Sequence, residues 1–176
     1  MNNVITKLKE MSACIDAIEW IKQYDTFSEA WNNCERGDWM LWLIERKIKN
    51  LKQRKVLVLC ACQCARLSLK YVKKGERRPL EAIETAEKWA NNEKGITIQD
   101  VKNAASAANA AAYAAYAAAP SAANAAAYAA YAAAAAYAAA SSAASAASSA
   151  AYAANRKKTF NKCAEIVREF YPSYKF

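Results

Sequence analysis

The sequence predicts an all-α fold, a single-domain multi-helix bundle in which Ala/Tyr-rich helices pack closely. Three observations predict it. A tract of 53 residues, 103–155, contains 35 alanines and no charged residue. Elsewhere apolar residues recur three and four positions apart, which is the period of one helix face. The three glycines, Gly37, Gly75 and Gly95, fall between the segments with this period, where we expect connections.

The alanine tract contains an internal repeat. Residues 106–119 recur identically as residues 121–134, with Pro120 between the copies. In each copy one Ser, one Asn and two Tyr follow a 3-4-3 spacing, which places them on one helical stripe with Ala on the other faces. Ala is the strongest helix former because it loses no rotamer freedom. Low-complexity disorder, the alternative, is enriched in proline, glycine and charge, which this tract nearly lacks.

Pro120 kinks or breaks this helical tract, because proline lacks an N–H and its ring clashes with the carbonyl four residues earlier. We expect one helix over about 97–118 and a second over about 121–140. A third is expected from the serine-rich stretch 141–149 to residue 171. The tyrosine stripe either fills gaps between helices or lines a ligand-facing surface.

Shorter helices are expected before the tract. The first covers 4–11, and Ser12 is a candidate N-cap for the second. Residues 26–29, Thr-Phe-Ser-Glu, form a capping-box pattern that opens a third helix. Gly37 is expected to break the chain and Asp38 to cap the very apolar helix that follows it.

Residues 56–71 are expected to form a central helix. The run Val-Leu-Val-Leu-Cys at 56–60 resembles a buried strand, but the length and the Ala and Gln content favour a helix that is apolar almost all round. Pro79 fits the first turn of the next helix. Residues 97–100, Thr-Ile-Gln-Asp, are a candidate cap for the first Ala-rich helix.

The six cysteines are expected to be reduced and metal-free. The chain has no histidine, and the spacing of Cys60, Cys62 and Cys64 is not that of zinc ligands. On a helix Cys62 points away from the other two, so all three are expected to be small buried hydrophobes.

Charge and composition narrow the location and the partners. The net charge of +9 and the pI near 9.3 favour anionic partners. We expect one domain over 1–176, with a mixed helical half (1–95) and an Ala/Tyr-rich half (96–176). The first residues do not resemble a signal peptide and the tract is too polar for a membrane span, which predicts a cytoplasmic protein with no membrane partner.

The missing residue types exclude much chemistry. Without histidine there is no Ser-His or Cys-His nucleophile pair, and no Gly-rich loop is present to hold a phosphate. Carboxylate pairs such as Asp16/Glu19 and Glu81/Glu84 are typical of solvated helix faces. The sequence therefore favours a protein that is not an enzyme and needs no cofactor.

Aromatic rings beside Arg or Lys are the candidate binding chemistry, because rings stack on bases and guanidinium groups bind phosphate. The alternative is Trp in the core with a solvated basic rim. A site shared between the two halves, or between subunits of a homo-oligomer, would use both sets of candidates. The candidate ligand-binding residues are Trp39, Trp42, Arg66, Arg77, Arg78, Tyr113, Tyr116, Tyr128 and Tyr131.

Besides the Ala/Tyr tract, four segments form an ordered set of motifs: AWNNCERGDWMLW at 30–42, ACQCARL at 61–67, GERRPLEAIE at 75–84 and RKKTFNKCAEIVR at 156–168. Together they resemble the Ala/Tyr-rich immunity-protein family of phages and bacteria over residues 12–172. The resemblance implies inhibition of a toxin or defence factor by binding, and it brings no established active-site residues. Cys62 and Pro120 depart from the family pattern.

Residues and resemblance together predict a non-enzymatic immunity or counter-defence protein. It would neutralise a toxin or defence effector protein, or sequester a small anionic nucleotide. The alternative is a nucleic-acid-binding helical protein that uses the basic stretches 46–55 and 66–78, with steeply salt-dependent binding. A structural role related to ice binding or assembly is disfavoured by the tyrosine stripe, because regularly spaced Thr is absent.

Overall fold

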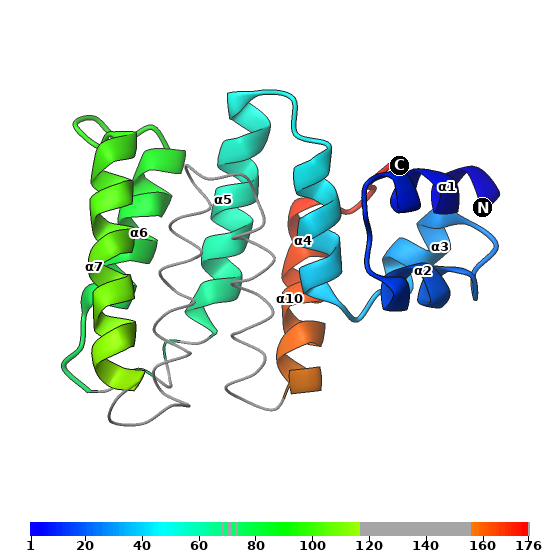
Figure 1. The fold of residues 1–176 in the computed structure, drawn as a ribbon. Helices are drawn as coiled ribbons and strands as arrows, with labels where there is room; N and C mark the ends of the chain where they lie inside the picture. Colours follow the sequence, from blue (N-terminus) through cyan, green and yellow to red (C-terminus); the bar gives the residue numbers. More distant parts are fainter. Residues whose placement is uncertain (68, 70–71, 73, 117–155, 176) are drawn as a thin grey trace.

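The computed structural model describes residues 1–67, 69, 72, 74–116 and 156–175, and these residues form eight helices and no strand (Figure 1). The predicted all-α fold class is confirmed. The two helices expected to begin at 121 and at 141–149 start outside the described residues. The helices are α1 (Asn2–Glu10), α2 (Ile15–Ile21), α3 (Phe27–Asn33), α4 (Gly37–Arg46), α5 (Leu51–Arg66), α6 (Arg78–Ala90), α7 (Ile98–Tyr116) and α10 (Arg156–Phe170).

Helix α5 lies between two groups of helices: α6 and α7 pack on one side, and α4 and α10 on the other (Figure 1). Its cysteines show the two faces. Cys62 belongs to the core shared with α6, where its thiol donates to the Ile83 carbonyl at 3.8 Å. Cys60 and Cys64 belong to the core on the other side. The expectation that Cys62 points away from its two neighbours is confirmed, and all three are buried.

The first core, here called the alanine core, joins α5, α6 and α7. It is built mostly from small side chains, because five of the nine buried residues described are alanine. Small side chains allow helix axes to approach to the low end of the usual ~8–10 Å. Its buried residues are Val58, Cys62, Ala65, Ala82, Ile83, Ala86, Ala90, Val101 and Ala105.

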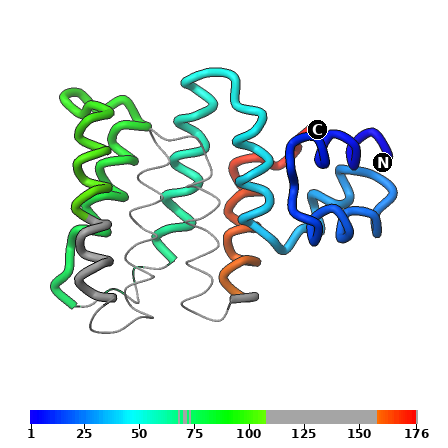
Figure 2. Tube along the Cα trace, viewed as in Figure 1, coloured from blue at the N-terminus to red at the C-terminus, as the bar shows by residue number. Residues whose placement is uncertain are grey.

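The second core, here called the aromatic core, joins α1 to α5 and α10. Large aliphatic side chains such as Leu41 and Ile44 fill it, and many half-buried rings pack around them. The chain after α10 also joins it: the Tyr174 ring stacks on Trp31 with centroids 4.7 Å apart. The two chain ends therefore lie at the same end of the molecule (Figure 2).

Several helix starts follow the sequence signals. The Thr26 hydroxyl accepts from the Glu29 N–H at 3.2 Å, while the Glu29 carboxylate accepts from the Asp25 N–H, one residue earlier than in a standard capping box. Before α7, the Thr97 hydroxyl accepts from the Asp100 N–H and the Asp100 carboxylate accepts from the Thr97 N–H at 2.7 Å. Pro79 stands in the first turn of α6. These predictions are confirmed.

Ser12 does not cap α2, so that expectation was wrong. Ser12 has a φ of 62° and ends α1 instead. Its N–H donates to the Lys9 carbonyl and the Ala13 N–H donates to the Leu8 carbonyl, the bond pair of a Schellman motif. Cys14 is the residue that precedes α2.

Gly37 and Asp38 were also placed incorrectly. Gly37 is the first residue of α4 and lies in no connection, and Asp38 is inside the first turn, with its carboxylate turned to Arg36. A Cβ on Gly37 would lie 2.5 Å from the Cys163 Cβ and 2.7 Å from the Ala164 nitrogen. Gly37 therefore lets α4 touch the backbone of α10, and this close approach has no signal in the local sequence.

Candidate binding surfaces

An arginine and an aspartate form a closed ion pair at the start of α4. The Arg36 guanidinium donates to the Asp38 carboxylate through Nε at 2.8 Å and through Nη2 at 2.6 Å. It lies between two rings, with its Cζ 4.2 Å from the Trp39 centroid and 4.4 Å from the Phe160 centroid. The bond to Asp38 raises the pKa of Arg36 above its usual value. The charges of Arg36 and Asp38 therefore neutralise each other within the fold.

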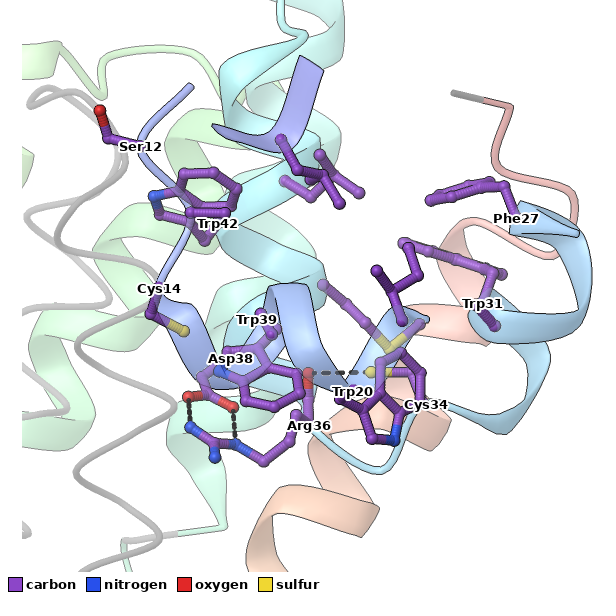
Figure 3. Close-up of a pocket in the computed structure, with 17 residues that line it drawn as sticks. Ser12, Cys14, Trp20, Phe27, Trp31, Cys34, Arg36, Asp38, Trp39 and Trp42 are labelled. Carbon is purple, nitrogen blue, oxygen red and sulfur yellow. Dashed lines mark hydrogen bonds and ion pairs between the residues drawn. The ribbon is translucent and has the colours of Figure 1, made fainter. Parts of the chain in front are cut away.

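Beside this pair, helices α1 to α4 enclose a cavity of about 370 Å³, here called the aromatic cavity. In Figure 3 the rings of Phe27 and Trp31 lie on one side of it, Trp42 on the other, and Trp20 and Trp39 at its lower edge. Apart from the Arg36–Asp38 pair, its lining is uncharged. The lining residues are Leu8, Ser12, Ala13, Cys14, Ala17, Trp20, Ile21, Phe27, Ala30, Trp31, Cys34, Arg36, Asp38, Trp39, Met40, Trp42 and Leu43.

A second, more open hollow of about 670 Å³ shares Trp20, Arg36 and Trp39 with the aromatic cavity. Its remaining lining is more polar and includes Glu35 and Asn161. The stacked Arg36 and Trp39 side chains therefore stand at the boundary of both spaces.

The turn between α4 and α5, at the top of Figure 1, has the opposite character. We call Arg46, Lys49, Leu51, Lys52 and Arg54 the basic corner. Leu51 is 58% exposed, and none of the four cations forms an ion pair with a described carboxylate. Reciprocal capping fixes the turn, because the Gln53 N–H donates to the Asn50 side chain and the Lys49 N–H donates to the Gln53 side chain.

Charge changes sign at this corner. Residues 1–45 carry four basic and eight acidic side chains, whereas residues 46–176 carry 21 basic and eight acidic. The α1–α3 region with most of α4 is therefore net negative, and the rest of the chain is strongly positive. Burial raises the pKa of Glu45, at the end of the acidic part, although Arg46 and Arg54 nearby oppose that shift.

The structure separates the predicted site residues into three places. Trp39 and Trp42 line the aromatic cavity, where Arg36 and Arg46 stack on their rings. Arg66 on α5 donates to the Glu87 carboxylate on α6 through Nε at 2.9 Å and through Nη2 at 2.6 Å. None of the three predicted arginines lines either space described above.

The other two predicted arginines lie at the start of α6. Arg78 binds the Glu76 carboxylate through two nitrogens, and this bond lowers the pKa of Glu76. Arg77 is 75% exposed and makes a longer contact of 3.6 Å to Glu81. Tyr113 and Tyr116 lie on α7 where only the backbone is described, and Tyr128 and Tyr131 lie outside the described residues.

Sequence reasoning missed Trp20, Phe27, Trp31 and Arg36 as companions of Trp39. Trp31 and Trp20 are 8 and 19 residues before Trp39 on separate short helices, so no local spacing joins them. The Arg-x-Asp sequence at 36–38 was the available signal, since it brings opposite charges together beside an aromatic residue.

Two wider searches of the described residues complete the picture. No group of three or more His, Cys, Asp or Glu side chains is placed to hold a metal ion in the part of the chain described here. Within the same residues, no helix has both the length and the apolar composition needed to cross a membrane.

Comparison with known proteins identifies the class. Residues 46–173, nearly three quarters of the chain, match the model of a family described as "Imm-5 like putative immunity protein". The chain belongs to this Imm-5-like immunity-protein family, which confirms the family suspected from the motifs. The match includes the basic corner, α5, α6, α7 and α10, whereas the aromatic cavity is lined by residues that precede it. Neither the curated proteins nor the solved structures give a match.

Proposed function

We propose that this chain is a non-enzymatic immunity protein that neutralises a toxin or defence effector by binding an acidic face of that protein. Family membership supports the immunity role. The observation that carries the choice of partner is the basic corner, where four cations that form no ion pair within the described residues lie within five positions of an exposed leucine.

The basic corner has the composition of a binding surface. Specific interfaces commonly place an apolar residue at the centre and polar or charged residues at the rim, and Arg is enriched in them. Leu51 is the apolar residue; Lys52 follows it on α5, and Arg46 is the last residue of α4 on the other side of the turn. Complementary charge speeds encounter and disfavours partners of the wrong sign. The partner that fits carries Asp and Glu around an apolar contact.

The anionic nucleotide and the nucleic acid are less well supported partners. A nucleotide site needs a ring and guanidinium groups in one place. Here Trp39 and Trp42 line a cavity that lacks Arg66, Arg77 and Arg78, and Arg66 and Arg78 are already bound to carboxylates. Arg77 is the most exposed of the three, at 75%, and keeps this alternative testable.

The first experiment looks for rescue. Genes that arrest bacterial growth when induced are co-expressed with the chain, and we expect at least one effector whose arrest the chain relieves. The purified effector and the purified chain should then form a complex by isothermal titration calorimetry. Rescue without any physical complex would contradict neutralisation by binding, and the absence of rescue across effector classes would contradict the immunity role.

The second experiment tests whether the partner binds at the basic corner. Lys49→Glu with Lys52→Glu reverses two exposed corner charges, and Lys74→Glu with Lys94→Glu reverses two exposed charges elsewhere. Both pairs change the net charge equally. We expect the corner pair to raise Kd by roughly 10- to 100-fold, since charged contacts at an interface contribute a few kcal/mol, and the control pair by much less. Equal effects would show that only net charge matters. Loss on Arg77→Ala with Arg78→Ala, but not at the corner, would favour a nucleotide.

A further inference from the structure

The aromatic cavity is separate from the basic corner and has a different chemistry. We infer that it is a binding site for a small, neutral, aromatic molecule. Its volume of about 370 Å³ falls in the range of roughly 300–1,000 Å³ that small-molecule sites occupy. It lies between α1–α3 and α4, so the ligand would bind within the acidic part of the chain, residues 1–45.

The arrangement of rings determines the shape of the ligand. Five aromatic side chains line the cavity, three of them from α2 and α3 and two from α4. Several are fixed by contacts outside it: the Trp31 Nε1 donates to the Tyr171 carbonyl at 3.1 Å, and Trp20 packs on Tyr24 with centroids 4.9 Å apart. Rings favour offset or edge-to-face partners at centroid distances of about 4.5–7 Å. Walls of ring faces and edges that are held in place suit a planar aromatic guest.

The charges determine that the ligand is neutral. Arg36 and Asp38 are the charged lining residues, and each satisfies the other at 2.6–2.8 Å. An anion entering the cavity would meet no unpaired cation among the lining residues, and residues 1–45 around it are net negative. A charge placed in an apolar site without a partner loses its hydration and gains nothing in return.

The test uses two fluorescent molecules with the same ring system. N-phenyl-naphthylamine is neutral, and anilinonaphthalene sulfonate adds one negative charge to the same rings. We expect one neutral probe to bind per chain, saturably and with quenching of tryptophan emission, and with a Kd at least about tenfold lower than that of the sulfonate. Equal or tighter binding of the sulfonate, or a signal that never saturates, would overturn the inference without any variant.

Filling the cavity provides the second test. Ala17→Phe adds a ring to the α2 wall, and Ala13→Phe adds one from the segment before α2. Ala107→Phe is the matched control, because it makes the same change at an exposed position of α7. We expect both cavity variants to abolish saturable probe binding and the control to bind normally. Thermal unfolding reports whether each variant is folded, and a folded cavity variant that binds the probe as tightly as the unchanged chain would contradict the proposal.

The same variants separate this site from the immunity function. Growth rescue by the chain depends on the basic corner in our proposal and not on the aromatic cavity. Ala17→Phe should therefore lose the probe and retain rescue, while the corner charge reversals should lose rescue and retain the probe. If Ala17→Phe loses rescue while folded and the corner variant does not, the effector contacts the cavity, and the assignment of a free small molecule fails.

Discussion

The two cores on either side of α5 are packed with side chains of different size. The alanine core brings three helices together through small side chains, and the residues with the largest buried side chains in it are Ile83, Val58 and Val101. The aromatic core joins six helices through large side chains and rings, and it contains the cavity of about 370 Å³. Helices that carry small residues can approach until no space remains between them. Rigid rings, in contrast, leave space wherever their shapes do not fit together. Space for a ligand therefore arises beside the rings.

The same substitution should cost much more stability in the alanine core than in the aromatic cavity. Ala86 in the alanine core is fully buried, so Ala86→Phe forces six extra carbon atoms between α6 and its neighbours. We expect a loss of about 3 kcal/mol or more in the free energy of unfolding, at the upper end of what overpacking costs. Ala17→Phe in the cavity should leave stability within about 1 kcal/mol, because its ring enters empty space. Urea unfolding of both variants checks the contrast, and equal losses would mean that the cavity closes in solution.

At Gly37 the aromatic core also depends on close backbone approach. Gly37→Ala would place a Cβ 2.7 Å from the Ala164 nitrogen and the Cys163 carbonyl carbon, and backbone atoms of α10 cannot move aside alone. We expect a loss of about 2–3 kcal/mol in unfolding free energy. Gly95→Ala is the comparison, since it has no neighbour within 4 Å and only its φ of 84° opposes the change. It should cost about 1 kcal/mol. A larger loss at Gly95 would contradict the role given to the α4–α10 contact.

These contacts also show how much of the structure can be predicted from the sequence. Local signals predicted the helices well, because caps and periodicity act within four residues: Thr97 with Asp100 and the two faces of α5 are examples. Ser12 was misplaced because its residue type suits a helix start, while the bonds of its neighbours to α1 place it after a helix end. Gly37 resembled a break because the reason for its missing side chain lies on α10, about 126 residues later.

The candidate site was predicted less completely for the same reason. Trp39 was predicted to be an aromatic ligand-binding residue, and it does line a cavity. The cation that accompanies it was sought among Arg66, Arg77 and Arg78, whereas Arg36 stacks on the ring. The pairing of Arg66 with Glu87, 21 residues apart, follows from the packing of α5 on α6, which composition and spacing do not determine. Which rings share a cavity depends on how α1–α4 pack, so the aromatic cavity required the structure.

A buried thiol in the aromatic core should make stability depend on alkaline pH. Burial raises the pKa of Cys34 from 9.0 to about 11, and a hydrogen bond with the Arg36 backbone opposes this only in part. Above pH 9 the unfolded thiol ionises and the folded one does not, so its stabilising contribution is complete below about pH 9 and is lost as pH rises towards 11. The stability advantage over Cys34→Ala should shrink by about 2 kcal/mol between these limits. Cys14→Ala, which removes an exposed thiol, is the matched control. An advantage that does not shrink would place Cys34 in contact with water.

The smallest effect concerns a hydroxyl that the aromatic core encloses without a partner. The Tyr171 hydroxyl is buried and has no hydrogen bond within the described residues, and burial raises its pKa. A buried polar group without a partner costs its desolvation energy, so Tyr171→Phe should stabilise the fold by about 1 kcal/mol. Tyr174→Phe is the matched change in the same core, where the hydroxyl donates to the Leu43 carbonyl at 3.4 Å. That variant should be neutral or slightly destabilised. Chemical unfolding of the two variants measures the difference in stability. A destabilised Tyr171→Phe would mean that an ordered water or a bound ligand forms a hydrogen bond with the Tyr171 hydroxyl in the aromatic core.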